Sequence, residues 1–347
     1  MSRITPTMSD VAREAGVAIA TVDRVLNKRA PVRSGTEKKV LEAAKRLGFA
    51  LGKLKSLDDI YQENDRSNIR KIAFVLLRSS SPFYQMLAAA LTLMSISVPG
   101  VRGDSEVFFL DDRPPTQVAE TLLELGERFD AIALVSVDHP AINQAIDTLY
   151  GRGIPVYALI TDLTATHRAG YIGLDNRKAG RTAAWAVAGL SRRTGKIGML
   201  IGDHRFLCQE LCEISFRSYI REHCNDFQVL EPRLVYEDAQ RAAEATHALL
   251  AGHPDLVGLY VSGGGMEGVV EALKESGRAR DIVVVCHELT EVTRSALVEG
   301  VVDVVLSIRC EQLARTLMET MTRTADSRQN GSASLLLPFD IISAENI

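Results

Sequence analysis

The segment TMSDVAREAGVAIATVDRVLN, residues 7–27, predicts two short helices separated by a glycine-centred turn. Thr7, followed three residues later by Asp10, is similar to a capping box, which satisfies free backbone N–H groups where a helix begins. Gly16 stands at the turn, where a positive φ is expected. A third amphipathic helix is predicted over residues 35–47, with Gly48 after its end. The fold class predicted for this part of the chain is a small all-α unit.

The second helix, predicted over residues 19–27, has one apolar face and one face open to a partner. Val22, Val25 and Leu26 can pack against the first helix. The opposite face holds Ile19, Ala20, Asp23, Arg24 and Asn27. In a helix–turn–helix, the second helix lies in the major groove of duplex DNA with its first residues at the base edges. A three-helix core without a ligand is the alternative.

The charge distribution favours the DNA-binding alternative. Residues 1–57 contain 12 lysines and arginines against 5 acidic residues, whereas the remaining 290 residues contain 28 against 39. A basic N-terminal unit on an acidic body is typical of a unit that binds phosphates.

Three segments, DVAREAGV (10–17), TVDRVLN (21–27) and VLEAAKRLGF (40–49), resemble the DNA-binding headpiece of the LacI family of bacterial transcription regulators. The resemblance implies base-edge positions for Ile19, Ala20 and Arg24 and phosphate contacts for Thr21 and Asn27. Arg24 is the strongest candidate for reading sequence, because a guanidinium can grip guanine in a bidentate fork. The predicted DNA-binding residues are Thr7, Ile19, Ala20, Thr21, Arg24, Asn27, Leu54 and Leu57.

The chain departs from the family pattern at three places. Ala18 replaces the usual serine at the start of the second helix and removes an N-cap that contributes about 1 kcal/mol. Asp23 stands where a small polar residue is usual. After Phe49 the chain reads ALGKLKSLDD without the Pro-Asn pair that precedes the family's hinge helix. Leu54 and Leu57 are the candidates for the leucine that this hinge inserts into the minor groove.

Composition indicates a multidomain globular protein. With 347 residues, 46% of them hydrophobic and 24% charged, the chain suggests two or three domains and contains no apolar run long enough to span a bilayer. The segment MSRITPTMSD lacks the apolar region of a secretory signal, which predicts a cytoplasmic protein. The five cysteines fit no zinc spacing and are expected to be reduced thiols. No metal, cofactor or membrane partner is predicted.

From Lys71 to Ile308, short apolar strands alternate with amphipathic helices, which predicts parallel sheets covered by helices. A segment of this many strands and helices favours two lobes. We expect the chain to cross from one lobe to the other near Asp162, and a ligand to bind between the lobes. GLDNRKAG (173–180) and VCHELT (285–290) resemble the periplasmic-binding-protein-like effector domain of the same family. The predicted division is a headpiece (1–50), a hinge (51–70) and a two-lobed α/β domain (71–347), with lobe 1 at 71–161 plus 309–335 and lobe 2 at 162–308.

Residues at the strand ends are the candidates for an effector site. Carboxylates and hydroxyls bind the hydroxyl groups of a sugar or polyol, and an aromatic ring such as Phe83 can stack on the sugar's C–H face. The predicted effector-binding residues are Ser79, Phe83, Asp138, His139, Asp162, Cys212, Ser262 and Glu288. The alternative is that several of them cap helices. Cys212 stands where the family places an effector-binding arginine, and Ile308 where a glutamine is frequent.

An enzyme hypothesis rests on Gly263, Gly265 and Gly268, which form G-x-G-x-x-G between a predicted strand and a helix, with Glu288 further on. The motif lies late in the chain, with no hydride-transfer site and no catalytic set of residues nearby. The favoured prediction is therefore not an enzyme but a sequence-specific repressor that binds near-palindromic DNA as a homodimer, or as a tetramer, under the control of a sugar or polyol. A DNA-tethered dinucleotide-binding enzyme or sensor and an effector-independent regulator are the alternatives.

Overall fold

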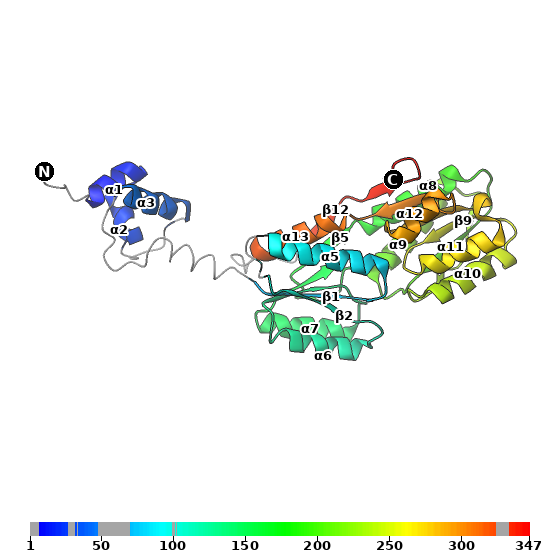
Figure 1. The fold of residues 1–347 in the computed structure, drawn as a ribbon, viewed down its shortest axis with the longest axis horizontal. Coiled ribbons are helices and arrows are strands. Elements are labelled where there is room, and N and C mark those ends of the chain that lie inside the picture. Colours follow the sequence, from blue (N-terminus) through cyan, green and yellow to red (C-terminus); the bar gives the residue numbers. More distant parts are fainter. Residues whose placement is uncertain are drawn as a thin grey trace. The chain divides into compact units, whose positions relative to one another are not determined.

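The computed structural model describes residues 7–26, 32, 34–47, 70–98, 101, 103–323 and 333–347, which form two compact units divided after Asn68 (Figure 1). Among the helices in these ranges, none combines the length and the apolar character needed to cross a membrane.

The smaller unit contains α1 (Met8–Ala15), α2 (Ile19–Leu26) and α3 (Ser34–Leu47). Its small apolar core consists of Val11, Ala12, Val22, Val25, Val40, Ala43 and Ala44. Gly16 follows α1 with φ 66°, and its N–H donates to the carbonyls of the last turn of the helix. The predicted three-helix arrangement is confirmed, because each helix has one apolar stripe and the three stripes meet.

The larger unit contains two lobes, each built around one sheet. In the described residues of lobe 1, six parallel strands have the order β12-β5-β4-β3-β1-β2. Helices α5 and α13 cover one face of this sheet, and α6 and α7 cover the other (Figure 1). The elements are β1 (Ile72–Leu76), α5 (Pro82–Ser97), β2 (Glu106–Phe109), α6 (Pro115–Leu125), β3 (Ala131–Leu134), α7 (Pro140–Gly151), β4 (Val156–Leu159), β5 (Gly170–Leu174), α13 (Cys310–Arg323) and β12 (Ala333–Leu337).

Lobe 2 has the strand order β13-β11-β10-β9-β6-β7, and β8 also pairs with β6. All described pairs are parallel except β11 with β13. Helices α8 and α9 cover one face, and α10, α11 and α12 cover the other. The elements are α8 (Asn176–Leu190), β6 (Lys196–Ile201), α9 (Leu207–His223), β7 (Gln228–Val229), β8 (Arg233–Leu234), α10 (Ala239–Gly252), β9 (Leu256–Val261), α11 (Met266–Ser276), η1 (Ala279–Asp281), β10 (Val283–His287), α12 (Glu291–Val298), β11 (Val304–Ser307) and β13 (Asp340–Ile342).

The topology corrects the predicted first crossing between lobes. The crossing lies after Leu174 rather than near Asp162, because β5 hydrogen-bonds to β4 and β12 within the first sheet. The chain returns to lobe 1 with α13, and β13 then pairs with β11 in lobe 2. These repeated crossings place the carboxyl ends of strands from both sheets at the junction of the lobes, where ligands of such folds bind.

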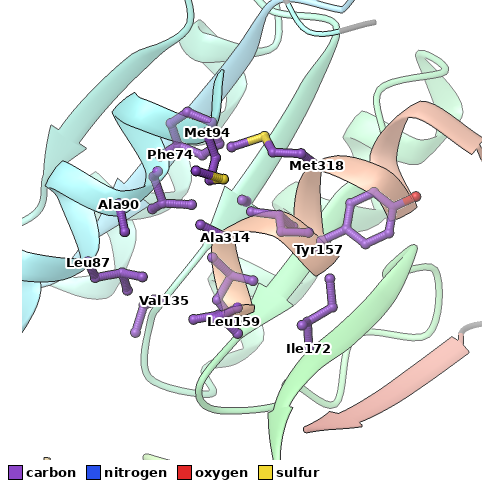
Figure 2. Packing of buried hydrophobic residues seen from close by; sticks show 14 of the residues in the cluster. Phe74, Leu87, Ala90, Met94, Val135, Tyr157, Leu159, Ile172, Ala314 and Met318 are labelled. Carbon is purple, nitrogen blue, oxygen red and sulfur yellow. The ribbon is translucent and has the colours of Figure 1, made fainter. Parts of the chain in front are cut away.

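The core of lobe 1 shows how two distant segments cover one face of its sheet. Leu87, Ala90 and Met94 of α5 lie beside Phe74 of β1, whereas Ala314 and Met318 come from α13 (Figure 2). All of these side chains are buried. Burial on this scale holds the strand ends in place, and the loops that follow them carry the cavity described below.

Candidate nucleic-acid interface and ligand cavity

The exposed face of α2 is the candidate nucleic-acid interface. Val22 and Val25 are buried, whereas Ile19 is 54% exposed, Ala20 and Arg24 are exposed and Thr21 is half-buried. The face that holds Ile19, Ala20 and Arg24 is therefore available to a partner, as the helical spacing predicts.

Thr7 has a structural role at the start of α1. Its hydroxyl and its backbone N–H donate to Asp10 Oδ2 at 2.7 and 2.9 Å, and the Asp10 N–H donates back to Thr7 Oγ1. These hydrogen bonds lower the pKa of the Asp10 carboxyl, which also pairs with Arg13 at 2.7 Å. The predicted capping box is thus confirmed. The predicted contacts of Asn27, Leu54 and Leu57 lie outside the described residues.

A cavity of about 470 Å³ lies between the two lobes of the larger unit. Lobe 1 lines it with Arg78, Phe83 and Tyr84, among others, and lobe 2 with the loops after β6, β8, β9 and β10. The volume falls within the range of small-molecule sites. Hydrogen bonds join the lobes around it, including Asp138 N–H to the Arg205 carbonyl at 2.8 Å.

Four of the predicted effector-binding residues line this cavity: Phe83, Cys212, Ser262 and Glu288. Ile308, at the other position where the chain departs from the family pattern, lines it as well. The strand-end argument therefore leads to the region of the fold where this cavity lies, and effector binding there stays a prediction.

The other four predicted residues are not on the cavity wall, and each is engaged by other residues of lobe 1. Ser79 donates to Asp111 Oδ1 through its N–H and its hydroxyl, both at 2.9 Å. Asp138 accepts from Asn143 and from Thr164. His139 caps α7 through Nδ1. Asp162 forms a bidentate pair with Arg168 at 2.6 and 2.8 Å. The capping alternative is correct for His139.

A polar cluster lies against the cavity wall in lobe 2. The Tyr260 hydroxyl lies 2.7 Å from His287 Nε2, and Tyr260 and Ser262 both approach the Cys212 thiol. Burial lowers the pKa of His287 to about 4, so its imidazole is neutral at neutral pH. Burial raises the pKa of Cys212 to about 11, which keeps the thiol protonated. This cluster therefore brings no positive charge to the cavity.

Glu288 presents a carboxyl group whose partners are neutral. Its Oε2 accepts from the Ser307 hydroxyl at 3.2 Å and from the Ile308 N–H at 3.3 Å. Burial raises the pKa of Glu288 to about 8, although these two hydrogen bonds act in the opposite direction. Glu288 has φ 66°, in the left-handed region. A residue other than glycine adopts this backbone conformation only when contacts with its surroundings offset the strain.

Glu237 is a second cavity carboxyl group, which the sequence analysis did not identify. Oε1 accepts from Gln209 Nε2, and Oε2 accepts from the Gly264 N–H, both at 2.7 Å. Burial raises its pKa. One sequence signal was its position, because Glu237 follows the strand Arg233–Leu234 and therefore lies near a strand end. Its orientation toward the cavity depends on a turn in which Tyr236 and Glu237 adopt positive φ values. Nothing in the sequence pattern predicted this turn.

The glycine motif has a packing role and an acidic neighbour. A Cβ on Gly268 would lie 1.8 Å from the Ala239 carbonyl oxygen of α10, so this glycine lets α10 and α11 approach closely. The Gly264 N–H in the same loop is occupied by Glu237. A carboxylate at this position would repel a pyrophosphate, so the geometry disfavours the dinucleotide hypothesis.

Two family models match the chain. The model described as bacterial regulatory proteins, lacI family, matches residues 7–50, and a periplasmic binding protein domain model matches residues 112–329. The HTH-type regulator RegA of Clostridium saccharobutylicum is 62% identical over 42 residues, which are 12% of this chain and 13% of RegA. The HTH-type regulator reg1 of Streptomyces lividans is 28% identical over 217 residues, covering 59% of this chain and 56% of reg1. The chain thus spans little more than half of such relatives at most.

Solved structures of sugar-binding proteins share the fold of the larger unit. A glucose-galactose binding protein of Geobacillus stearothermophilus has a TM-score of 0.69 and 16% identity, covering 80% of this chain and 98% of that protein. A solute-binding protein of Agrobacterium vitis bound with α-D-tagatopyranose has a TM-score of 0.70 and 20% identity, covering 79% and 95%. One of Bacillus halodurans with bound myo-inositol has a TM-score of 0.69 and 18% identity, covering 80% and 95%. At these identities, the similarity shows the fold.

Proposed function

The chain belongs to the LacI family of bacterial regulatory proteins, and we propose that it is a cytoplasmic DNA-binding transcription repressor controlled by a small-molecule effector. The observation that carries the proposal is the exposed face of α2 on a capped helix–turn–helix unit, within the segment that matches the family. The curated relatives that match are named as transcription regulators, which favours this function over an enzyme.

The larger unit supports the proposed effector control. Its cavity is formed by both lobes, so a ligand bound there changes the free energy of lobe closure if it binds the open and closed forms with different affinities. A sugar or polyol is the proposed class, since carboxyl, amide and hydroxyl groups line the cavity and related folds bind sugars. The regulator would bind a near-palindromic operator as a homodimer, with half-sites set by its two-fold symmetry.

Replacing Arg24 with alanine tests the DNA-binding role. If the guanidinium makes a bidentate contact with guanine, we expect the loss of roughly 1–3 kcal/mol at one base pair, or about 5- to 150-fold in affinity. The measurement first selects the preferred DNA of the purified full-length protein, and then determines Kd for that DNA and for single-base variants of it. The signature is a relaxed preference at one position of each half-site.

The matched control is Arg46→Ala, which removes the same charge from α3, where Arg46 pairs with Glu14 at 3.5 Å. This change can weaken the attraction to phosphates uniformly but should leave the base preference intact. An Arg24→Ala protein with an unchanged preference at every position would show that Arg24 does not read the sequence.

A further inference from the structure

We infer that the effector carries a protonated amine, as in an amino sugar, because the cavity between the lobes offers it two carboxyl groups and no free cation among its lining residues. This inference rests on the proposed effector role of the cavity and specifies the chemistry of its ligand.

The charges on the cavity wall are strongly unbalanced. Its acidic residues are Glu237, Asp238, Glu267 and Glu288, and the only lysine or arginine in the lining is Arg78. The Arg78 guanidinium is already engaged, at 2.9 Å from Asp112 Oδ1 and 3.2 Å from the Tyr236 carbonyl. His287 is neutral at neutral pH. A ligand therefore meets more acidic groups than available cations.

Glu237 and Glu288 have no salt bridge among the described residues, although the Arg78 charge acts to lower the pKa of Glu237. Within the described ranges, Glu237 and Glu288 accept hydrogen bonds only from neutral donors: an amide side chain, a hydroxyl and backbone N–H groups. Asp238 differs, because it caps α10 by accepting from the Arg241 N–H at 2.8 Å. Glu267 is exposed at the rim. The cavity acids that accept hydrogen bonds only from neutral donors and cap no helix are thus Glu237 and Glu288.

Tyr84, Glu237 and Glu288 line the same cavity of about 470 Å³. Burial raises the pKa of this tyrosine well above its usual value, and the charges of Glu237 and Glu288 act in the same direction. Phe83 beside it contributes an aromatic surface. Both carboxyl groups therefore belong to the wall of a single small-molecule cavity.

A cationic ligand can form an ionic interaction with these carboxyl groups, whereas a neutral ligand cannot. A neutral polyol offers these carboxyl groups only hydrogen bonds and leaves Glu288 protonated, since ionising a buried carboxyl group without a cation costs several kcal/mol. A protonated amine supplies the missing charge and charge-assisted hydrogen bonds. The hydroxyl groups of an amino sugar can still bind the neutral polar side chains of the cavity wall, such as Gln209 and Ser262.

The test compares matched ligands that differ only in an amine: D-galactosamine with D-galactose, D-glucosamine with D-glucose, and an amino-inositol with myo-inositol. Titration calorimetry on the full-length protein gives Kd for each. In any pair that binds, we expect the amine to bind at least about tenfold more tightly, which corresponds to one charge-assisted hydrogen bond.

Proton release provides a second readout. At about pH 6.5 Glu288 of the empty cavity is largely protonated, and a bound ammonium should ionise it. Calorimetry in buffers of different ionisation enthalpy should therefore show a proton released for the amine but not for its neutral partner. Glu237→Gln and Glu288→Gln should each reduce the preference for the amine, and Glu288→Gln should also abolish the release. Glu271→Gln, an exposed residue of α11 outside the cavity lining, is the control and should change neither.

Three outcomes decide the inference. Tighter binding of the amines with proton release supports it. Equal or tighter binding of the neutral sugars overturns it and leaves the proposed effector role intact. If neither class binds and neither changes DNA affinity, both the inference and the effector role are overturned, while the DNA-binding role tested with Arg24 still stands.

Discussion

Replacing Glu288 with glutamine will stabilise the larger unit at about pH 9 and change its stability little at about pH 5. The pKa of Glu288 is about 8 in the folded protein, against a reference value of 4.5. Between these values the folded state binds one more proton than the unfolded state, so the free energy of unfolding falls as the pH rises. Above pH 8 the full penalty applies, on the order of 5 kcal/mol. Glutamine removes it.

The design isolates the charge of one residue. A glutamine Oε1 can still accept from the Ser307 hydroxyl and the Ile308 N–H, so the hydrogen bonds that position the side chain are retained. Other groups that titrate, including His287, are common to both proteins and cancel in the difference. Denaturant unfolding across this pH range measures that difference, with Glu267→Gln as an exposed control. A difference that is constant with pH would mean that Glu288 ionises normally in the fold.

Local sequence signals predicted the local structure well. Thr7, Asp10 and Gly16 define the first helix through contacts between near neighbours, and the structure has the predicted capping box and positive φ. Alternating apolar strands and amphipathic helices likewise predicted two parallel sheets. β5 was missed, because Gly170–Leu174 is short and its identity as a strand depends on β4 and β12, which lie far apart in sequence.

The sequence predicted the position of the cavity between two lobes, but only some of the residues that line it. Position at a strand end identified Phe83, Cys212, Ser262 and Glu288, because topology alone brings those loops together. Strand-end position alone does not distinguish an acid that faces the cavity from one that forms a salt bridge within its own loop. Asp162 is engaged by Arg168, six residues away, whereas Glu237 turns inward through two consecutive residues with positive φ. Both outcomes depend on loop conformation, which the apolar pattern does not encode.

Replacing Gly268 with alanine will destabilise the larger unit by about 3 kcal/mol or more. A Cβ at this position would lie 1.8 Å from the carbonyl oxygen and 2.8 Å from the carbonyl carbon of Ala239, which are backbone atoms of α10. Relief requires α10 and α11 to separate, and overpacking of this kind costs 1–3 kcal/mol or more. Gly189→Ala is the matched control, since it also lies in a helix but has nothing within 4 Å of the added Cβ. This control should gain up to about 1 kcal/mol from helix propensity.

The contrast between these two variants also separates the two explanations of the G-x-G-x-x-G motif. If Gly268 is needed for helix packing, the midpoint of urea unfolding falls for Gly268→Ala in the absence of any ligand and rises slightly for Gly189→Ala. If the glycine instead makes room for a dinucleotide, the ligand-free variant should unfold like the control, and binding of NAD alone should suffer. The close approach of α11 to Ala239 and the Glu237 carboxyl group in the adjoining loop both favour the first result. A Gly268→Ala protein as stable as the control would show that the two helices do not meet at this residue.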